Sequence, residues 1–136
     1  MKRHVLIACC KTKLAGRNEA QNCYVSPLFK LSKQYAAKRG LPFSILSAKY
    51  GLLEPTELIE PYDQTLLRMN KQERRKWGMK VRNQIHFAFS KRTCFVMLTG
   101  RAYSQPLNGL LMEFPLKDLS IGRRLQYLSE FVKQTT

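Results

Sequence analysis

Three short apolar runs alternate along the chain with longer stretches in which apolar residues recur at helical spacing. The runs predict buried β-strands at residues 4–8, 42–46 and 93–98. A strand, a helix and a second strand within residues 4–46 indicate a βαβ unit, which is normally parallel. The alternation therefore predicts an α/β fold, a small, mostly parallel sheet with helices on both faces in three layers.

Polar capping residues mark where the predicted helices begin. Ser26, followed by a proline, opens a helix that runs to about residue 39. Asn70, with Glu73 as its capping-box partner, opens a long helix. Ser120 opens a last helix, and a short helix is predicted at residues 107–112. The residues of the last helix that are predicted to face inward are Ile121, Leu125, Leu128 and Phe131.

Two longer segments lack a regular pattern and are predicted to be loops. Residues 9–22 are mostly polar, and residues 47–63 contain a glycine and two prolines that disfavour a long regular element. A loop as long as the second often carries function. The segments that follow the three strands begin at Cys9, Ser47 and Thr99. Because ligands of such sheets bind beyond the carboxyl ends of the strands, these segments are expected to converge on one site.

The excess of basic over acidic residues indicates which kind of molecule the protein binds. The chain has 136 residues, a length that predicts one domain spanning residues 1–136. It carries 24 Lys and Arg against 9 Asp and Glu, a net charge of +15. Polyanions are the natural partners of such a surface, and DNA is favoured over RNA. The sequence leaves the oligomeric state open.

Apolar runs and cysteine spacing indicate the compartment. No run is long enough to cross a membrane or to act as a secretory signal, so no membrane association is expected. The four cysteines show neither CxxC spacing nor the density of a disulfide framework. A reduced, cytoplasmic protein is therefore expected.

One helix concentrates the positive charge. The predicted helix that follows Asn70 carries six basic residues against one acidic residue, so pairing within the helix cannot neutralise it. We interpret this helix as the surface that contacts nucleic-acid phosphates. Its basic residues are Lys71, Arg74, Arg75, Lys76, Lys80 and Arg82.

Candidate chemistry gathers in the segments that follow the strands. The loop at residues 47–63 combines a lysine, tyrosines and carboxylates, which offer phosphate contact, base stacking and acid–base groups. The candidate catalytic residues are Lys49, Glu60, Tyr62 and Asp63. The candidate substrate-binding residues are Cys9, Cys10, Lys13, Ser26, Ser47, Tyr50 and Arg101. One pocket is expected to hold Lys49, Tyr62 and Asp63 together with Lys13 and Ser26.

Several of these residues have more than one interpretation. A thiol among the lysines of residues 9–13 can act as a nucleophile, or can simply end the strand as a small buried side chain. Lys13 can bind a phosphate, and Ser26 can either help to bind an anion or only cap its helix. The cysteines are poorly spaced for zinc, so neither a metal nor an organic cofactor is expected. His4 and His86 are predicted to be structural.

Residues 45–55, ILSAKYGLLEP, followed by Pro61 and Tyr62, resemble the signature of the YaaA peroxide-stress superfamily. Small phage and bacterial relatives in that superfamily share a Cys-Lys-x-Lys start and a Tyr-x-Ser-x-x-Phe helix entry. Those two patterns fall here on residues 10–13 and 24–29. The resemblance extends from the first strand to the last helix. It implies DNA binding and a part in protection from oxidative DNA damage.

A fainter likeness runs to the catalytic domain of archaeosine synthase, which acts on a deazapurine base in tRNA. That likeness places Cys9, Lys13 and Ser26 at equivalent points. Ala8 and Leu14 stand where that domain has prolines. Both resemblances imply work on nucleic acid, as the net charge does.

The leading hypothesis is a DNA-binding enzyme that processes a nucleobase by N-glycosidic cleavage of a modified or damaged base. A base within a duplex must first be flipped into the site. Tyr50 or Tyr62 would stack on it, and Asp63 or Glu60 would position water. One alternative is a non-enzymatic DNA-binding accessory protein of phage or stress systems. The other is a transferase that acts on a deazaguanine-type base and depends on a cysteine.

Overall fold

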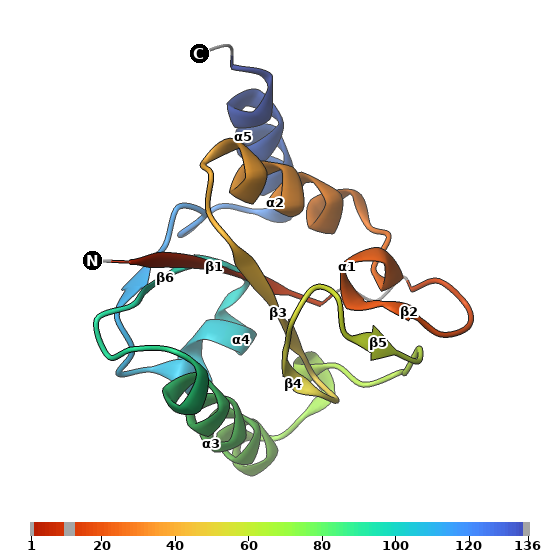
Figure 1. Ribbon diagram of the computed structural model, residues 1–136, viewed down its shortest axis with the longest axis vertical. Helices are drawn as coiled ribbons and strands as arrows, with labels where there is room; N and C mark the ends of the chain where they lie inside the picture. Colours follow the sequence, from red (N-terminus) through yellow and green to blue (C-terminus); the bar gives the residue numbers. More distant parts are fainter. Residues whose placement is uncertain (1, 10–12, 135–136) are drawn as a thin grey trace.

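A five-stranded sheet forms the centre of the protein (Figure 1). The computed structural model describes residues 2–9 and 13–134. Along the sheet, the strands are β4 (Gly51–Leu53), β3 (Phe43–Ser47), β1 (Arg3–Ala8), β6 (Cys94–Leu98) and β7 (Met112–Glu113). Neighbouring strands are parallel except for β3 and β4. The mostly parallel sheet and the three predicted strands are confirmed, with strand ends that shift by at most one residue.

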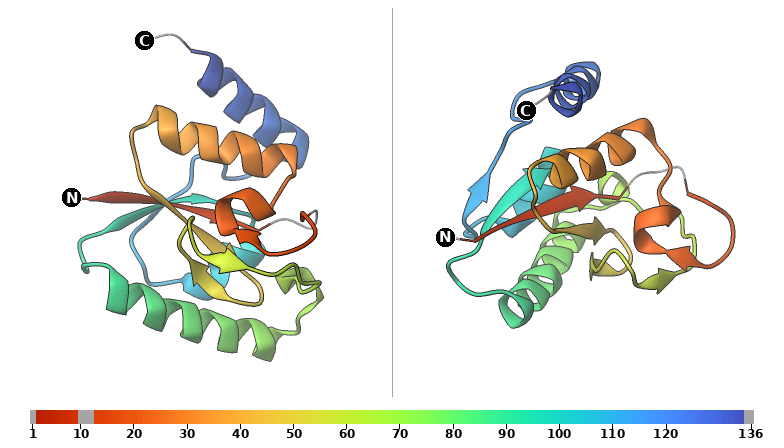
Figure 2. Two further views of the ribbon diagram at one scale, coloured as in Figure 1. Left: turned by 45° about the vertical axis from the view of Figure 1, so that its right-hand side comes forward. Right: turned by 45° about the horizontal axis from the view of Figure 1, so that its top comes forward.

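Helices cover both faces of this sheet and complete the predicted three layers (Figure 2). The helical elements are α1 (Ala20–Cys23), α2 (Pro27–Lys38), η1 (Leu66–Arg68), α3 (Lys71–Ala88), α4 (Arg101–Ser104), η2 (Gln105–Leu107) and α5 (Ile121–Lys133). α2 and α5 pack together on one face, and α3 lies on the other. Each face of the sheet has its own hydrophobic core, and successive side chains of β1 point alternately into one core and the other. Val5 and Ile7 join the core under α2, whereas Leu6 joins the core under α3.

The predicted caps are present at all three long helices. The Ser26 side chain accepts a hydrogen bond from the backbone N–H of Phe29, at 3.2 Å. Asn70 and Glu73 form the reciprocal capping box. The side chain of Ser120 caps α5. These contacts satisfy backbone donors that a helix start would otherwise leave unpaired, which is why short polar residues locate the starts well.

Two helix predictions are wrong. The segment at residues 107–112 is not a helix, because the helical turns of α4 and η2 come earlier and end at Leu107. Gly109 then adopts a left-handed backbone, with φ of 105°, which leads the chain into β7. In α5, Leu128 is buried, but Ile121 is 66% exposed. Helical spacing assigns residues to a face, but it does not say how far the neighbouring element extends along that face.

Both predicted loops contain regular structure. β2 (Asn18–Glu19) and α1 interrupt the first, while β4 and β5 (Leu58–Ile59) interrupt the second. β2 and β5 pair antiparallel, so the two segments are joined beside the carboxyl edge of the sheet. Strands of two or three residues are too short to show alternation in a sequence, which explains why the pattern predicted loops.

The order of the strands creates a switch point between β1 and β6. The chain passes from β1 to β3 on one side, and β6 is added on the other side of β1. In open parallel sheets the ligand crevice lies at such a point, beyond the carboxyl ends of the strands. The residues that leave β1 and β6 at this edge are Cys9 and Thr99.

His4 is buried in β1, as expected, and its ring Nε2 lies 2.7 Å from the hydroxyl of Ser44. Burial lowers the pKa of His4 from 6.5 to about 4. The unfolded chain therefore takes up a proton at a higher pH than the folded one, and stability is lost as the pH falls from 6.5 towards 4. At about pH 4.5 this loss is expected to be roughly 2 to 3 kcal/mol of unfolding free energy.

Urea unfolding of wild-type protein and of His4→Gln at pH 7 and 4.5 tests this expectation. The variant is expected to lose less stability between the two pH values than the wild type does. His86→Gln is the matched control, because His86 is exposed on α3. An equal loss of stability in all three proteins would contradict a role for the His4 proton.

Candidate functional site

A cluster of hydroxyl and thiol groups lies at the carboxyl ends of β1 and β3. Ser47, the last residue of β3, is fully buried. Its hydroxyl accepts hydrogen bonds from the backbone N–H groups of Lys49 (3.2 Å) and Tyr50 (3.0 Å). It donates to the hydroxyl of Tyr62 at 2.7 Å. Ser47 therefore fixes both the turn that leaves β3 and the tyrosine that returns to it.

Tyr62 is the centre of this cluster. Its hydroxyl lies 2.7 Å from the Tyr24 hydroxyl as well as from Ser47. The ring of Tyr50 meets the Tyr62 ring edge-on, with centroids 5.6 Å apart. Burial raises the pKa of both Tyr62 and Tyr24 above the usual value. Both phenols are consequently neutral at pH 7, and they act as hydrogen-bonding groups.

Cys9 joins this cluster to the other side of the switch point. Its Sγ lies 3.2 Å from the hydroxyl of Tyr103, which comes from α4 after β6, and its side chain packs against the same core cluster as Tyr62. The Trp77 ring packs edge-on against Tyr103, and its indole N–H donates to the Ser47 carbonyl at 2.9 Å. Burial also raises the pKa of Tyr103. The thiol thus lies within hydrogen-bonding distance of a neutral tyrosine hydroxyl.

Lys13 supplies positive charge to the same place. Its ammonium group lies 4.5 Å from the centroid of the Tyr62 ring and 6.0 Å from that of Tyr24. A cation over an aromatic face is attracted by the ring quadrupole. The backbone of Lys13 also bridges to Tyr24, so both ends of this residue are positioned by the tyrosines.

A cavity of about 280 Å³ opens beside these groups. Its lining residues are Cys9, Lys13, Asp63, Gln64, Thr65, Leu67, Arg68 and Tyr103. The Asp63 side chain is 84% exposed, and one of its carboxylate oxygens lies 3.6 Å from the Arg68 guanidinium. A thiol, an ammonium group, a carboxylate and a phenol therefore share one small space. Such a set can hold a phosphate, donate hydrogen bonds to a polar ring and position a water molecule.

The structure brings some of the predicted site residues together and separates others. Lys13 and Asp63 line the cavity as expected, whereas Tyr62 does not line it and instead lies with its ring centroid 4.5 Å from the Lys13 ammonium group. The expected pocket is corrected for Ser26 and Lys49, neither of which lines the cavity. The hydroxyl of Ser26 is used in capping α2. Lys49 follows the turn at Ser47, and its ammonium group lies over the Tyr50 ring instead, 5.2 Å from the centroid.

Three further candidates remain, and two of them lie outside this cavity. Glu60 is exposed, and its carbonyl accepts a hydrogen bond from the Tyr50 hydroxyl at 3.5 Å. Arg101 lines a second cavity at the end of β6. Cys10 falls outside the residues that the structure describes.

Sequence reasoning missed several members of the cluster. Tyr103 lies two residues after Arg101 at the end of the third strand, so the same topological argument would have found it. Thr65, Gln64 and Arg68 belong to a polar stretch with no motif, and their part in the cavity depends on the turn at η1.

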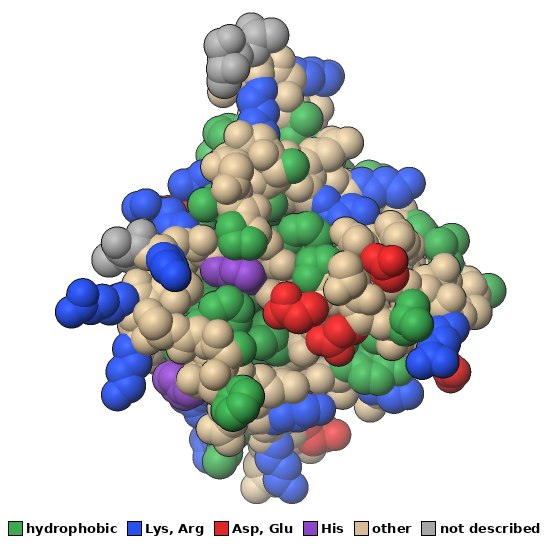
Figure 3. Space-filling model, viewed as in Figure 1, with side chains coloured by type: hydrophobic (Ala, Val, Ile, Leu, Met, Phe, Trp, Pro, Cys, Tyr) green, Lys and Arg blue, Asp and Glu red, His purple; other side chains and the backbone are tan. Residues whose placement is uncertain are grey.

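The basic helix α3 divides into two sets of side chains. Arg74 donates from Nε to the Leu66 carbonyl at 2.7 Å, Lys80 donates to the Lys49 carbonyl, and Arg82 donates to the Asn108 carbonyl. These three cations therefore brace neighbouring loops. The other basic residues of α3 are all exposed, namely Lys71, Arg75 and Lys76. Figure 3 shows Lys and Arg side chains around most of the outline of one face, with acidic side chains gathered nearer its middle.

The described part of the chain has neither a cluster of metal-ligating side chains nor a membrane-spanning helix. Over residues 2–9 and 13–134, no three His, Cys, Asp or Glu side chains come close enough together to hold a metal ion. Over the same residues, no helix has both the length and the apolar character that a bilayer crossing requires.

Comparison with known proteins identifies the family. The model of a family of unknown function, DUF6884, matches residues 5–130, a span that includes the central sheet from Val5 onward and the lining of both cavities. The chain is also similar to an uncharacterized protein, YfjM, of Bacillus subtilis (strain 168). The two are 32% identical over 148 aligned residues, which cover 98% of this chain and 97% of the relative. This chain is therefore a member of the DUF6884 family.

Proposed function

We propose that this protein is a DNA-binding enzyme that processes a nucleobase, by N-glycosidic cleavage of a modified or damaged base. The observation that carries the proposal is the small cavity in which Lys13, Asp63, Cys9 and Tyr103 meet at the switch point of the sheet. The protein that contains this cavity has a net charge of +15. The charge favours a nucleic-acid partner, and the cavity offers groups for chemistry on one base. The proposal includes a cytoplasmic site of action.

The arrangement supports a division of roles in base cleavage. The bond between the base and C1′ of the sugar breaks, and its electron pair leaves with the base. Asp63 would stabilise the positive charge that develops on the sugar and would orient the attacking water. The water adds its hydroxyl to C1′, and its proton ends on the released base. Lys13 would neutralise a neighbouring phosphate, and the Tyr103 hydroxyl would donate to the base.

Mass spectrometry of free bases tests the proposal. The protein would be incubated with genomic and phage DNAs that carry different base modifications, and the soluble fraction would be analysed. We expect one base to appear in equal amount with new abasic sites in the DNA. DNA binding without any released base would instead support the non-enzymatic accessory role.

One observation favours a second function. The thiol of Cys9 lines the cavity, with its Sγ 3.2 Å from the Tyr103 hydroxyl, so it can face a nucleotide that binds there. A transferase of deazaguanine-type bases would use this thiol to attack C1′ of the sugar, which displaces the resident base, and the incoming base would then displace the thiol. It would give exchange of a labelled base into nucleic acid without net formation of abasic sites.

A further inference from the structure

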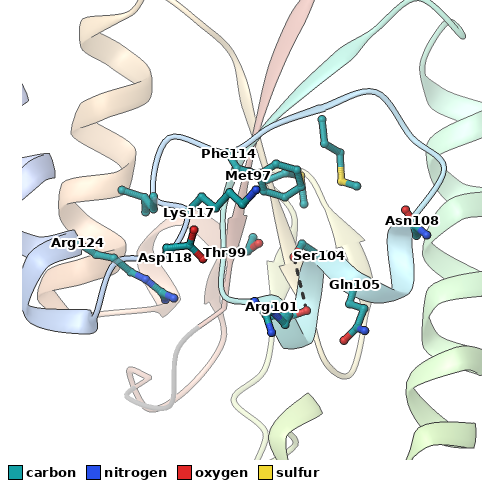
Figure 4. Close-up of a pocket in the computed structure, with 12 residues that line it drawn as sticks. Met97, Thr99, Arg101, Ser104, Gln105, Asn108, Phe114, Lys117, Asp118 and Arg124 are labelled. Atoms are coloured by element: carbon teal, nitrogen blue, oxygen red, sulfur yellow. Dashed lines mark hydrogen bonds between the residues drawn. The ribbon is translucent and has the colours of Figure 1, made fainter.

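A second cavity, of about 720 Å³, lies at the carboxyl end of β6 (Figure 4). Its walls come from β6, the α4–η2 segment, the chain that follows β7 and the start of α5. The lining residues are Met97, Thr99, Arg101, Ser104, Gln105, Asn108, Met112, Phe114, Leu116, Lys117, Asp118 and Arg124. Its volume falls within the range of roughly 300 to 1,000 Å³ that is typical of small-molecule sites.

Positive charge surrounds this cavity on more than one side. Arg101, Lys117 and Arg124 line it, against the single carboxylate of Asp118. Figure 4 shows Arg124 and Asp118 reaching in from one side and Arg101 from α4 on the other, with Thr99 between them. The Nε of Arg124 donates to the Leu119 carbonyl at 3.0 Å, which holds this guanidinium in place. Cations from separate elements around one hollow favour an anionic group such as phosphate.

Part of the lining is apolar and includes an aromatic ring. Met97, Met112 and Leu116 belong to the wall, and Phe114 joins them with 41% of its surface exposed. An exposed ring face next to flexible thioethers suits a flat aromatic group. The cavity therefore combines a surface for a planar ring with a separate cationic end.

Two local features of the cavity bear on ligand binding. The Thr99 hydroxyl is buried and has no hydrogen-bond partner among the described residues. A buried hydroxyl is normally paired, so a ligand atom at this point would restore the bond. Asp118 holds a left-handed backbone, with φ of 62°, which is uncommon for a residue other than glycine.

We propose that this cavity binds a free nucleoside phosphate. Arg101, Lys117 and Arg124 hold the phosphate groups, and the base packs on Phe114. The Asp118 carboxylate accepts a hydrogen bond from a sugar hydroxyl, and the Thr99 hydroxyl completes the polar contacts. The site is distinct from the cavity at Asp63, and the proposal does not depend on base cleavage.

Isothermal titration calorimetry without nucleic acid tests the site. The full chain would be titrated with the four common nucleoside diphosphates, the matching nucleosides and inorganic pyrophosphate. We expect at least one diphosphate to bind about tenfold or more tightly than both its nucleoside and pyrophosphate. Equal affinity for pyrophosphate and every diphosphate would show only general attraction of anions, and would overturn the proposal. Because no DNA is present, the titration tests nucleotide binding even if the protein releases no base from DNA.

Matched variants locate the binding. Arg101→Gln and Lys117→Gln remove exposed side chains at the cavity and are each expected to weaken nucleotide binding about fivefold or more. Arg123→Gln removes the same charge from an exposed position next to Arg124 that does not line the cavity, and binding should stay within about twofold. Thr99→Val is expected to weaken binding without lowering the melting temperature, because the hydroxyl has no partner within the described protein. Equal losses in Arg101→Gln and Arg123→Gln would contradict the assignment.

Discussion

Binding to DNA is expected to weaken about a thousandfold when salt is raised from roughly 50 to 200 mM, if at least six phosphates are neutralised. Changing Arg75 and Lys76 together to Gln is expected to reduce the slope of log affinity against log salt by about 2. Both side chains are exposed on α3 and have no hydrogen bond or ion pair to another described residue. Arg74 is left intact, since its guanidinium holds the Leu66 carbonyl.

Fluorescence anisotropy of a labelled DNA duplex at several salt concentrations measures both slopes. The matched control changes Lys30 and Lys133 to Gln. These lysines are also exposed but lie on α2 and α5, across the sheet from α3. The control removes the same total charge, so it accounts for the general field of the protein. If the Arg75 and Lys76 variant and the control variant lower the slope equally, α3 is not a specific contact surface. If the Arg75 and Lys76 variant leaves the slope unchanged, α3 does not contact the DNA.

The sheet was predictable because each of its main strands is a mostly apolar run. Residues such as Leu6, Ile45 and Val96 are fully buried between two helical layers, and the polar Ser44 inside β3 is buried against His4. Helix starts were predictable because Ser26 and Asn70 satisfy backbone donors locally. Features that depend on a distant partner were not predictable. The β2–β5 pair, for example, exists only because the two segments meet in space.

The candidate site was predictable at the level of the edge of the sheet and not at the level of each side chain. Topology alone brought Cys9, Lys13 and Asp63 to one edge, since they follow the first two strands. It could not show that the turn at Ser47 directs Lys49 away, or that Ser26 is occupied by its own helix. It also could not show that the switch point has two cavities, a small one with a thiol and phenols and a larger one with most of the charge.

Asp63→Asn is expected to lower the rate of base release about 100-fold or more while leaving DNA affinity nearly unchanged. The substitution keeps the shape of the side chain and removes the negative charge that would stabilise the sugar cation and orient water. The Asp63 carboxylate also forms an ion pair with Arg68 at 3.6 Å. The effect of losing this ion pair must therefore be distinguished from the effect of losing the carboxylate at the cavity. Single-turnover release of the base, followed by mass spectrometry, measures the rate.

Arg68→Gln is the matched control, because it breaks the same ion pair and retains the carboxylate at the cavity. Exposed ion pairs contribute little to stability, so this variant is expected to fold normally and to keep its rate within about fivefold. Cys9→Ser separates the two proposed reactions. Under base cleavage by water the thiol forms no bond, and the rate should fall only modestly. If Cys9→Ser loses about 100-fold or more while Asp63→Asn keeps its rate, a covalent step at the thiol replaces hydrolysis, because a serine hydroxyl is a far weaker nucleophile than a thiolate.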